Sequence, residues 1–138
     1  MRSTYTTQAT AVGGRTGSVA SADGAFNARL DKPAALGGFG GPGTNPEQLF
    51  AGAYAACFLD ALKRAAEEIG ETLTGDSNVT VDVTLESDLD AAALAVAVAV
   101  DLPGQRHADA VVLACRAHEL CPYSRILHGH LDVRVSVP

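Results

Sequence analysis

The spacing of apolar residues changes its period along this chain, and these changes restrict the fold more than any other feature of the sequence. Apolar residues recur every three or four positions over residues 49–69, as they do on one face of a helix. Strict alternation then follows in residues 79–85 and 94–100, which is typical of strands with one buried face. A second helical pattern covers residues 106–120, and alternation returns in residues 131–137. The pattern predicts two helices and three strands after position 45.

The first part of the chain adds further strands to this order. Residues 4–12 and 17–30 mix Thr, Val, Ser and Ala around a turn at residues 22–24, which indicates short strands joined by tight connections. The predicted order is therefore βββ-α-ββ-α-β, without regular alternation of strands and helices. This order favours an α+β fold with a largely antiparallel sheet over a doubly wound fold. With 138 residues, 47% of them hydrophobic, the chain is expected to form a single domain over residues 1–138.

Local signals mark both ends of the first helix. Asn45 is suited to cap it, Pro46 suits its first position and Gln48 falls at the third, while Gly70 marks its end. The glycine-rich run at residues 37–43 precedes the cap. It formally fits G-x-G-x-x-G, but no convincing strand precedes it and Pro42 removes an amide, so we expect a flexible loop and not a phosphate cradle.

Charge and hydropathy exclude several classes of partner. The net charge of -6 and the pI near 5.0 oppose the basic surface that binding to a phosphate backbone requires, so nucleic acid is not expected as a partner. No apolar run reaches the roughly 18 residues of a membrane span, and residues 1–20 are polar and glycine-rich where a secretory signal needs an apolar block. We expect a cytoplasmic protein that has no membrane partner.

The three cysteines lie in different contexts. Cys57 falls in the middle of the first helix on its apolar side, where a free cysteine is most often a small buried hydrophobe. Cys121 lies where the second helical pattern ends before Pro122, a junction that is expected to leave its side chain mobile and partly accessible and that suits a resolving thiol. An incidental loop cysteine is the alternative. Cys115 lies on the expected core stripe of the second helix with Ala108, Val111 and Val112, so a packing role is expected.

A metal site competes with redox chemistry for these residues. Cys115, His118 and Cys121 are three positions apart, but on a helix this spacing rotates each side chain by about 60°, and a fourth ligand is undefined. We therefore expect no metal and no cofactor. Since three cysteines without a secretory signal do not suggest a disulfide-stapled scaffold, thiols that are reduced between reactions are the favoured interpretation.

Several segments together carry a resemblance to one family. The chain resembles the organic hydroperoxide resistance proteins of the wider OsmC-like superfamily, in order and over nearly its whole length. The segments that carry the resemblance are Gly13-Gly14-Arg15-x-Gly17, Thr44-Asn45-Pro46-Glu47-Gln48-Leu49-Phe50, Ala55-Ala56-Cys57-Phe58 and Ala117-His118-Glu119-Leu120-Cys121-Pro122-Tyr123-Ser124. The additional thiol of Cys115 and the bulky residues 125–128 depart from the family pattern.

The resemblance implies a thiol peroxidase that reduces organic hydroperoxides to alcohols. It implies that Cys57 is the peroxidatic residue and forms a sulfenate, that Cys121 resolves it through a Cys57–Cys121 disulfide, and that Arg15 and Glu47 organise the first thiolate. It also implies a lipoylated protein as the dithiol reductant. The implied assembly is an intertwined homodimer, with sheets wrapped around central helices.

The chemistry of the substrate adds candidates for its binding. Apolar groups around the sulfur would favour organic over inorganic peroxides, because each buried methylene contributes about 0.8 kcal/mol. We expect Phe39, Leu49, Phe50 and Phe58 to line this site. If residues 46–69 form one straight helix, Glu47 and Cys57 are about 15 Å apart along its axis. Either the helix breaks, or Glu47 and Arg15 act on Cys57 of another subunit.

Two other functions remain open at this point. One is an OsmC-like peroxidase with a broader or inorganic preference, which relative turnover of organic hydroperoxides and hydrogen peroxide would distinguish. The other is a redox-sensing or binding module whose cysteines are oxidised without turnover, since thiols in a sequence reveal neither access nor a reductant.

Overall fold

The computed structural model describes residues 2–87 and 91–138, and its order of elements confirms the predicted α+β fold. Two short elements are additional, a 3-10 turn η1 and a helix α3. The elements are β1 (Ala9–Val12), β2 (Gly17–Ser21), β3 (Asn27–Leu30), η1 (Ala34–Leu36), α1 (Pro46–Glu68), β4 (Asn78–Ser87), β5 (Ala92–Asp101), α2 (His107–Leu120), α3 (Pro122–Leu127) and β6 (Val133–Ser136). They form two compact units, which divide between Leu49 and Phe50.

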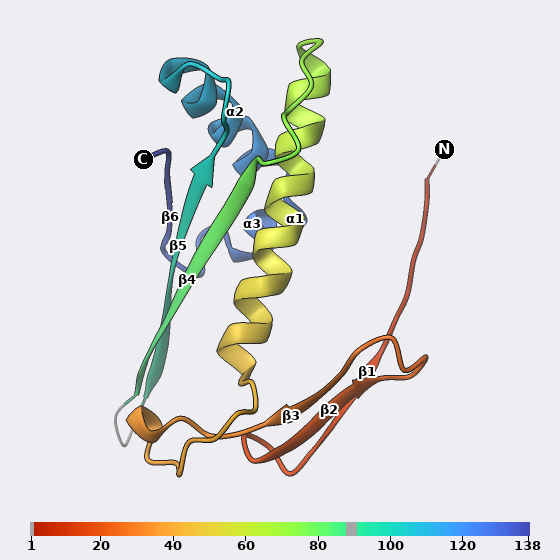
Figure 1. The fold of residues 1–138 in the computed structure, drawn as a ribbon, viewed down its shortest axis with the longest axis vertical. Helices are drawn as coiled ribbons and strands as arrows, with labels where there is room; N and C mark the ends of the chain where they lie inside the picture. Colours follow the sequence, from red (N-terminus) through yellow and green to blue (C-terminus); the bar gives the residue numbers. More distant parts are fainter. Residues whose placement is uncertain (1, 88–90) are drawn as a thin grey trace. The chain divides into compact units, whose positions relative to one another are not determined.

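The first unit contains an antiparallel sheet in the order β1-β2-β3 (Figure 1). The hairpin between β1 and β2 carries Arg15, and its turn depends on glycine. Gly13 has a φ of 82°, and a Cβ at Gly17 would lie 1.9 Å from the carbonyl oxygen of Val12. Since other residues strain or clash at these positions, the glycines hold the loop that presents Arg15.

The glycine-rich segment after β3 is a loop, as predicted, and hydrogen bonds connect it to the residues at the end of β3. The buried carboxylate of Asp31 accepts a hydrogen bond from the Gly43 amide at 2.6 Å. The Gly40 amide bonds the carbonyl of Lys32, and Thr44 forms a parallel bridge with Leu30. A buried carboxylate needs such partners, and here glycine lets the backbone approach it.

Helix α1 begins and ends at the predicted signals. The Asn45 side chain accepts the Gln48 amide at 2.8 Å, which caps the first turn. At the other end, the Gly70 amide bonds the carbonyl of Glu67 and the Glu71 amide bonds that of Ala66. These two bonds form a Schellman motif around Gly70, which has a φ of 74°. The helix is continuous between these caps.

The second unit packs helices against a sheet in the order β4-β5-β6. β4 and β5 pair antiparallel along their whole length, as predicted, and Figure 1 shows these long strands side by side. β5 and β6 pair parallel because α2 and α3 form the crossover between them. The core combines residues of α1, the sheet and α2, namely Tyr54, Phe58, Ala61, Leu62, Ala65, Ala66, Val81, Val96, Val98, Val100, Leu102, Ala110, Leu113, Ala114, Ala117 and Cys121.

The buried face of α2 differs from the predicted one. The expected stripe of Ala108, Val111, Val112 and Cys115 is exposed, with Val112 at 65%. The buried residues have the same spacing but lie two positions later, about 200° around the helix, on nearly the opposite face: Ala110, Leu113, Ala114 and Ala117. Because α2 is apolar on both faces, periodicity alone did not distinguish them.

In the described part of the chain, no helix is both long enough and apolar enough to cross a membrane.

Candidate thiol site

The second unit brings two of the predicted site residues together. The sulfur atoms of Cys57 on α1 and Cys121 between α2 and α3 lie 3.7 Å apart, and the Cys121 thiol donates toward Cys57. Both thiols are reduced. A disulfide requires about 2.05 Å between its sulfur atoms, so a small displacement is enough to join them.

The two sulfurs differ in their access to solvent. Cys57 is half-buried, whereas Cys121 is 0% exposed. The expectation that Cys121 is mobile and partly accessible was therefore wrong. The chain resumes helical geometry as α3 at Pro122, a residue suited to the first position of a helix, and this second helix encloses the thiol. The difference in exposure makes Cys57 the sulfur that an external reactant can reach first.

Burial raises the pKa of the Cys57 thiol, and the neighbouring Cys121 raises it further. The backbone N–H of Tyr123 donates to the Cys57 sulfur and lowers this pKa, but it does not outweigh burial. Asp60 adds a small contribution in the raising direction. The described groups of the second unit therefore oppose ionisation of the Cys57 thiol on balance.

Arg15 and Glu47 form a bidentate ion pair within the first unit. Nη1 of Arg15 lies 2.7 Å from Oε2 of Glu47, and Nη2 lies 2.6 Å from Oε1. The hydrogen bond from Arg15 lowers the pKa of the Glu47 carboxyl, and the same bond raises the pKa of Arg15. The pair joins the β1–β2 hairpin to the first turn of α1, and it fixes the plane of the guanidinium.

An apolar cavity of about 270 Å³ lies between α1 and α3, and its lining includes neighbours of both cysteines but neither cysteine itself. Phe50 and Ala53 lie seven and four residues before Cys57, on the same face of α1. From α3, Tyr123 lines the cavity, and its amide also donates to the Cys57 sulfur. The complete lining is Phe50, Ala53, Tyr123, Ile126 and Leu127.

The four predicted lining residues have different positions. Phe50 lines the cavity, whereas Phe58 is fully buried and packs against Tyr54 in the core. Leu49 is half-buried in the first turns of α1, and Phe39 is fully exposed in the loop before α1. The α3 residues of the cavity were not predicted, and the signal for them in the sequence is the run of bulky side chains at residues 125–128, which departs from the family pattern.

Cys115 lies on the exposed face of α2, so the predicted packing role was wrong. Within the described ranges, no three His, Cys, Asp or Glu side chains are grouped so that they could hold a metal ion. Nδ1 of His118 is buried and has no hydrogen-bond partner among the described residues.

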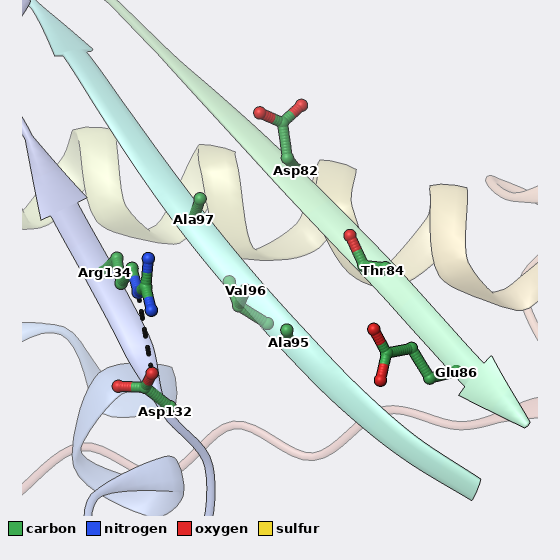
Figure 2. A pocket seen from close by; sticks show the side chains of 8 residues that line it. All are labelled: Asp82, Thr84, Glu86, Ala95, Val96, Ala97, Asp132 and Arg134. Atoms are coloured by element: carbon green, nitrogen blue, oxygen red, sulfur yellow. Dashed lines mark ion pairs between the residues drawn. The ribbon is translucent and has the colours of Figure 1, made fainter.

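A second hollow of about 320 Å³ lies on the face of the sheet opposite α1. Figure 2 shows its side chains standing on β4, β5 and β6 with α1 behind the sheet, and it shows the ion pair of Arg134 with Asp132. The floor consists of small residues such as Ala95 and Ala97, and the walls are polar. Neither hollow is lined by a cysteine, but the lining of the smaller apolar cavity includes Tyr123, whose amide donates to the Cys57 sulfur, so this cavity is the better candidate for a site of thiol chemistry.

Comparisons with known proteins agree with this geometry. Residues 38–136 match the family described as OsmC-like protein. The chain is 41% identical over 133 residues to an organic hydroperoxide resistance protein of Xanthomonas axonopodis pv. citri (strain 306), covering 96% of this chain and 94% of the relative. It is 37% identical to organic hydroperoxide resistance protein OhrB of Bacillus subtilis (strain 168), covering 96% and 97%.

Solved structures give the same result. The crystal structure of an organic hydroperoxide resistance protein from Legionella pneumophila superposes with a TM-score of 0.90 at 42% identity, covering 99% of this chain and 98% of that one. The chain therefore belongs to the OsmC-like protein family, among the relatives that carry the name organic hydroperoxide resistance protein.

Proposed function

We propose that this protein is a thiol peroxidase that reduces organic hydroperoxides to alcohols and protects against organic peroxide stress. The observation that supports the proposal best is the contact between a half-buried and a fully buried thiol, 3.7 Å apart, beside an apolar cavity. The printed names of the relatives, organic hydroperoxide resistance protein, point to the same substrates.

The first step takes place at Cys57. Its thiolate attacks the distal oxygen of the hydroperoxide, the O–O bond breaks, and the alkoxide takes a proton and leaves as the alcohol, with a sulfenic acid on Cys57. The apolar cavity holds the organic part of the substrate, with Phe50 and Tyr123 in its lining. Hydrogen peroxide has no organic part, so it gains nothing from this cavity.

The second step uses Cys121. Its thiol attacks the Cys57 sulfenic acid, an S–S bond forms, and the S–O bond breaks with release of water. Because Cys121 is buried, it is protected from direct attack by a bulky hydroperoxide. A dithiol reductant, in our proposal a lipoylated protein, then reduces the disulfide by exchange and restores both thiols.

Ionisation of Cys57 requires a cation, because burial and Cys121 raise the pKa of this thiol. In our proposal Arg15 supplies the charge and Glu47 orients it. α1 is one continuous helix, so a break between Glu47 and Cys57 is excluded as a way to bring them together. We therefore assign the Arg15–Glu47 pair to the Cys57 of a second copy of the chain.

A homodimer agrees with the exposed apolar surface of both units. All four residues of β1 are exposed, and Tyr5 and Val12 of the first unit are 85% and 68% exposed. In the second unit, Val111 and Val112 on α2 are also uncovered. A three-stranded sheet gains little stability without an apolar cover, so a second copy is expected to provide it.

Steady-state reduction of cumene hydroperoxide and of hydrogen peroxide with a dihydrolipoyl donor tests the function. Cys57→Ser is expected to abolish turnover, and Cys121→Ser to permit one oxidation and then over-oxidation, which intact mass detects. Cys115→Ser is the matched control and is expected to behave as wild type. Equal turnover of the two peroxides would favour the broader peroxidase, and oxidation without turnover would favour a redox-sensing module.

A further inference from the structure

A buried pair of hydroxyl groups lies beside the sulfurs, and the proposed reaction does not use it. The hydroxyl oxygens of Tyr54 on α1 and Ser124 on α3 are 2.5 Å apart. Tyr54 is 0% exposed and Ser124 is 1% exposed, so this hydrogen bond is shielded from water. Buried hydroxyl groups are costly unless they are paired, and these two satisfy each other.

The hydroxyl pair joins the same two segments of the chain as the thiol pair. Tyr54 lies three residues before Cys57, and Ser124 lies three residues after Cys121. Residues three apart on a helix share a face, so the hydrogen bond links the same two segments as the sulfur contact, about one turn away from it. The hydrogen bond from the Arg125 amide to the Cys121 carbonyl shows that Cys121 is part of the first turn of α3.

Helix α3 depends on such contacts for its position. It has only six residues, too few for a helix to persist without tertiary support. The ring of Tyr123 meets that of Tyr54 edge-on, with centroids 6.1 Å apart, but this contact fixes no hydrogen-bond register. The Tyr54–Ser124 bond joins side chains of both helices, whereas the other hydrogen bond described between α1 and α3 runs from the backbone amide of Tyr123 to the Cys57 sulfur.

We propose that Tyr54 and Ser124 are positioning residues, whose hydrogen bond holds α3 in register with α1 so that the Cys121 thiol reaches the oxidised Cys57 before a second peroxide does. This inference rests on the proposed peroxidase function. To form the disulfide, the sulfurs must close from 3.7 Å to about 2.05 Å. The Tyr54–Ser124 hydrogen bond lies one helical turn from the sulfurs. It limits sliding of α3 along α1 but still permits the two sulfurs to approach each other.

Two reactions compete for the Cys57 sulfenic acid. In one, the Cys121 thiol displaces the hydroxyl group as water and forms the S–S bond. In the other, a second hydroperoxide transfers its distal oxygen to the sulfur, which gives a sulfinic acid and an alcohol. The hydroxyl pair exchanges no atom or electron in either reaction. Its loss therefore changes the ratio of the two products and not the rate of the first oxidation.

The test compares wild type with Tyr54→Phe and Ser124→Ala, and uses Tyr5→Phe as a control that removes an exposed phenol hydroxyl. Reduced protein receives increasing amounts of cumene hydroperoxide, and intact mass gives the shares of disulfide and sulfinic acid. We expect both variants to raise the sulfinic share at least fivefold, with the first oxidation rate within about twofold of wild type. The double variant is expected to equal the single ones, because both remove the same bond.

Other results would overturn the assignment. Folded variants that form the disulfide in the wild-type proportion would show that the bond does not position Cys121. Unfolding of both variants, measured by circular dichroism and urea titration, would show that the pair serves overall stability instead. A wild type that forms no Cys57–Cys121 bridge would contradict the proposed function itself, and this outcome is distinct because the control shares it.

Discussion

Arg15 binds both carboxylate oxygens of Glu47, so its guanidinium has a fixed plane as well as a fixed place. Gly13 and Gly17 shape the hairpin that carries Arg15, and the Asn45 cap sets the first turn of α1, on which Glu47 lies. The carboxylate orients the cation but also offsets part of its charge. An oriented guanidinium stabilises a thiolate that lies along its remaining N–H groups.

Arg15→Lys is expected to lower kcat/KM for cumene hydroperoxide by about tenfold or more. Lysine keeps the charge but cannot form the two parallel hydrogen bonds, and one pKa unit at the thiol corresponds to about 1.4 kcal/mol. The rate of iodoacetamide alkylation of Cys57 between pH 6 and 10 measures the thiol pKa, which should rise in the variant. Arg29→Lys is the control, because Arg29 also pairs with a carboxylate. An unchanged alkylation profile in Arg15→Lys would contradict the proposed role.

The ion pair of Glu47 with Arg15 predicts that stability depends on pH. Because Arg15 lowers the pKa of Glu47 below its ordinary 4.5, the pair stabilises the fold above that pH. The contribution is lost as pH falls through the lowered value. Since the Arg15 side chain is 35% exposed, we expect Glu47→Gln to cost only about 0.5 kcal/mol at pH 7 and progressively less as pH falls below 4.5. Urea unfolding across this range measures the difference, and Glu71→Gln is the control. A difference that does not decrease as pH falls below 4.5 would contradict the ion-pair explanation.

The apolar cavity predicts a preference for longer alkyl hydroperoxides. A buried methylene contributes about 0.8 kcal/mol, or roughly fourfold in kcat/KM, until the cavity is filled. Ile126→Ser should reduce this increase per methylene, because Ile126 lines the cavity. Ile69→Ser is a matched control, since Ile69 is similarly exposed at the other end of α1. If kcat/KM increases equally per methylene in Ile126→Ser and Ile69→Ser, this cavity is excluded as the site that binds the alkyl group of the hydroperoxide.

The lowered pKa of His118 predicts a second dependence of stability on pH, at higher pH than that of Glu47. Burial lowers the pKa of His118, and His128 lowers it further, while Glu119 opposes both. The unfolded chain therefore takes up a proton at the ordinary pKa of 6.5 before the folded chain does. Stability is complete above pH 6.5 and decreases as pH falls through the lowered value. In His118→Gln the urea midpoint should decrease less between pH 7 and 5, while His107→Gln should follow wild type.

Sequence patterns predicted the elements that depend on local interactions. The Asn45 cap, Pro46 and Gly70 set the ends of α1 through bonds between near neighbours, and these signals were confirmed. The long alternation in β4 and β5 also predicted their pairing, because the larger apolar side chains of each strand lie on one face. The contact of Cys57 with Cys121 agrees with the pairing that the family resemblance implied.

The burial of Cys121 and the buried face of α2 depend on tertiary packing, and they were not predicted correctly. Pro122 was interpreted as the end of a helix, but proline also starts helices, and α3 buries Cys121. On α2 two apolar stripes compete, and the one with Cys115 remained exposed because Leu113 and its neighbours fill the core. A single sequence gives no measure of which stripe packs better, since that depends on the shape of the opposing surface.

The unequal access to the two sulfurs has a kinetic consequence. In the proposed reaction Cys121 is enclosed, so oxidant and reductant both react at the half-buried Cys57 and cannot occupy it together. Turnover is then expected to follow a ping-pong scheme, with parallel lines in double-reciprocal plots. At high concentration the hydroperoxide is expected to slow reduction of the disulfide, and the dithiol reductant is expected to slow oxidation of Cys57.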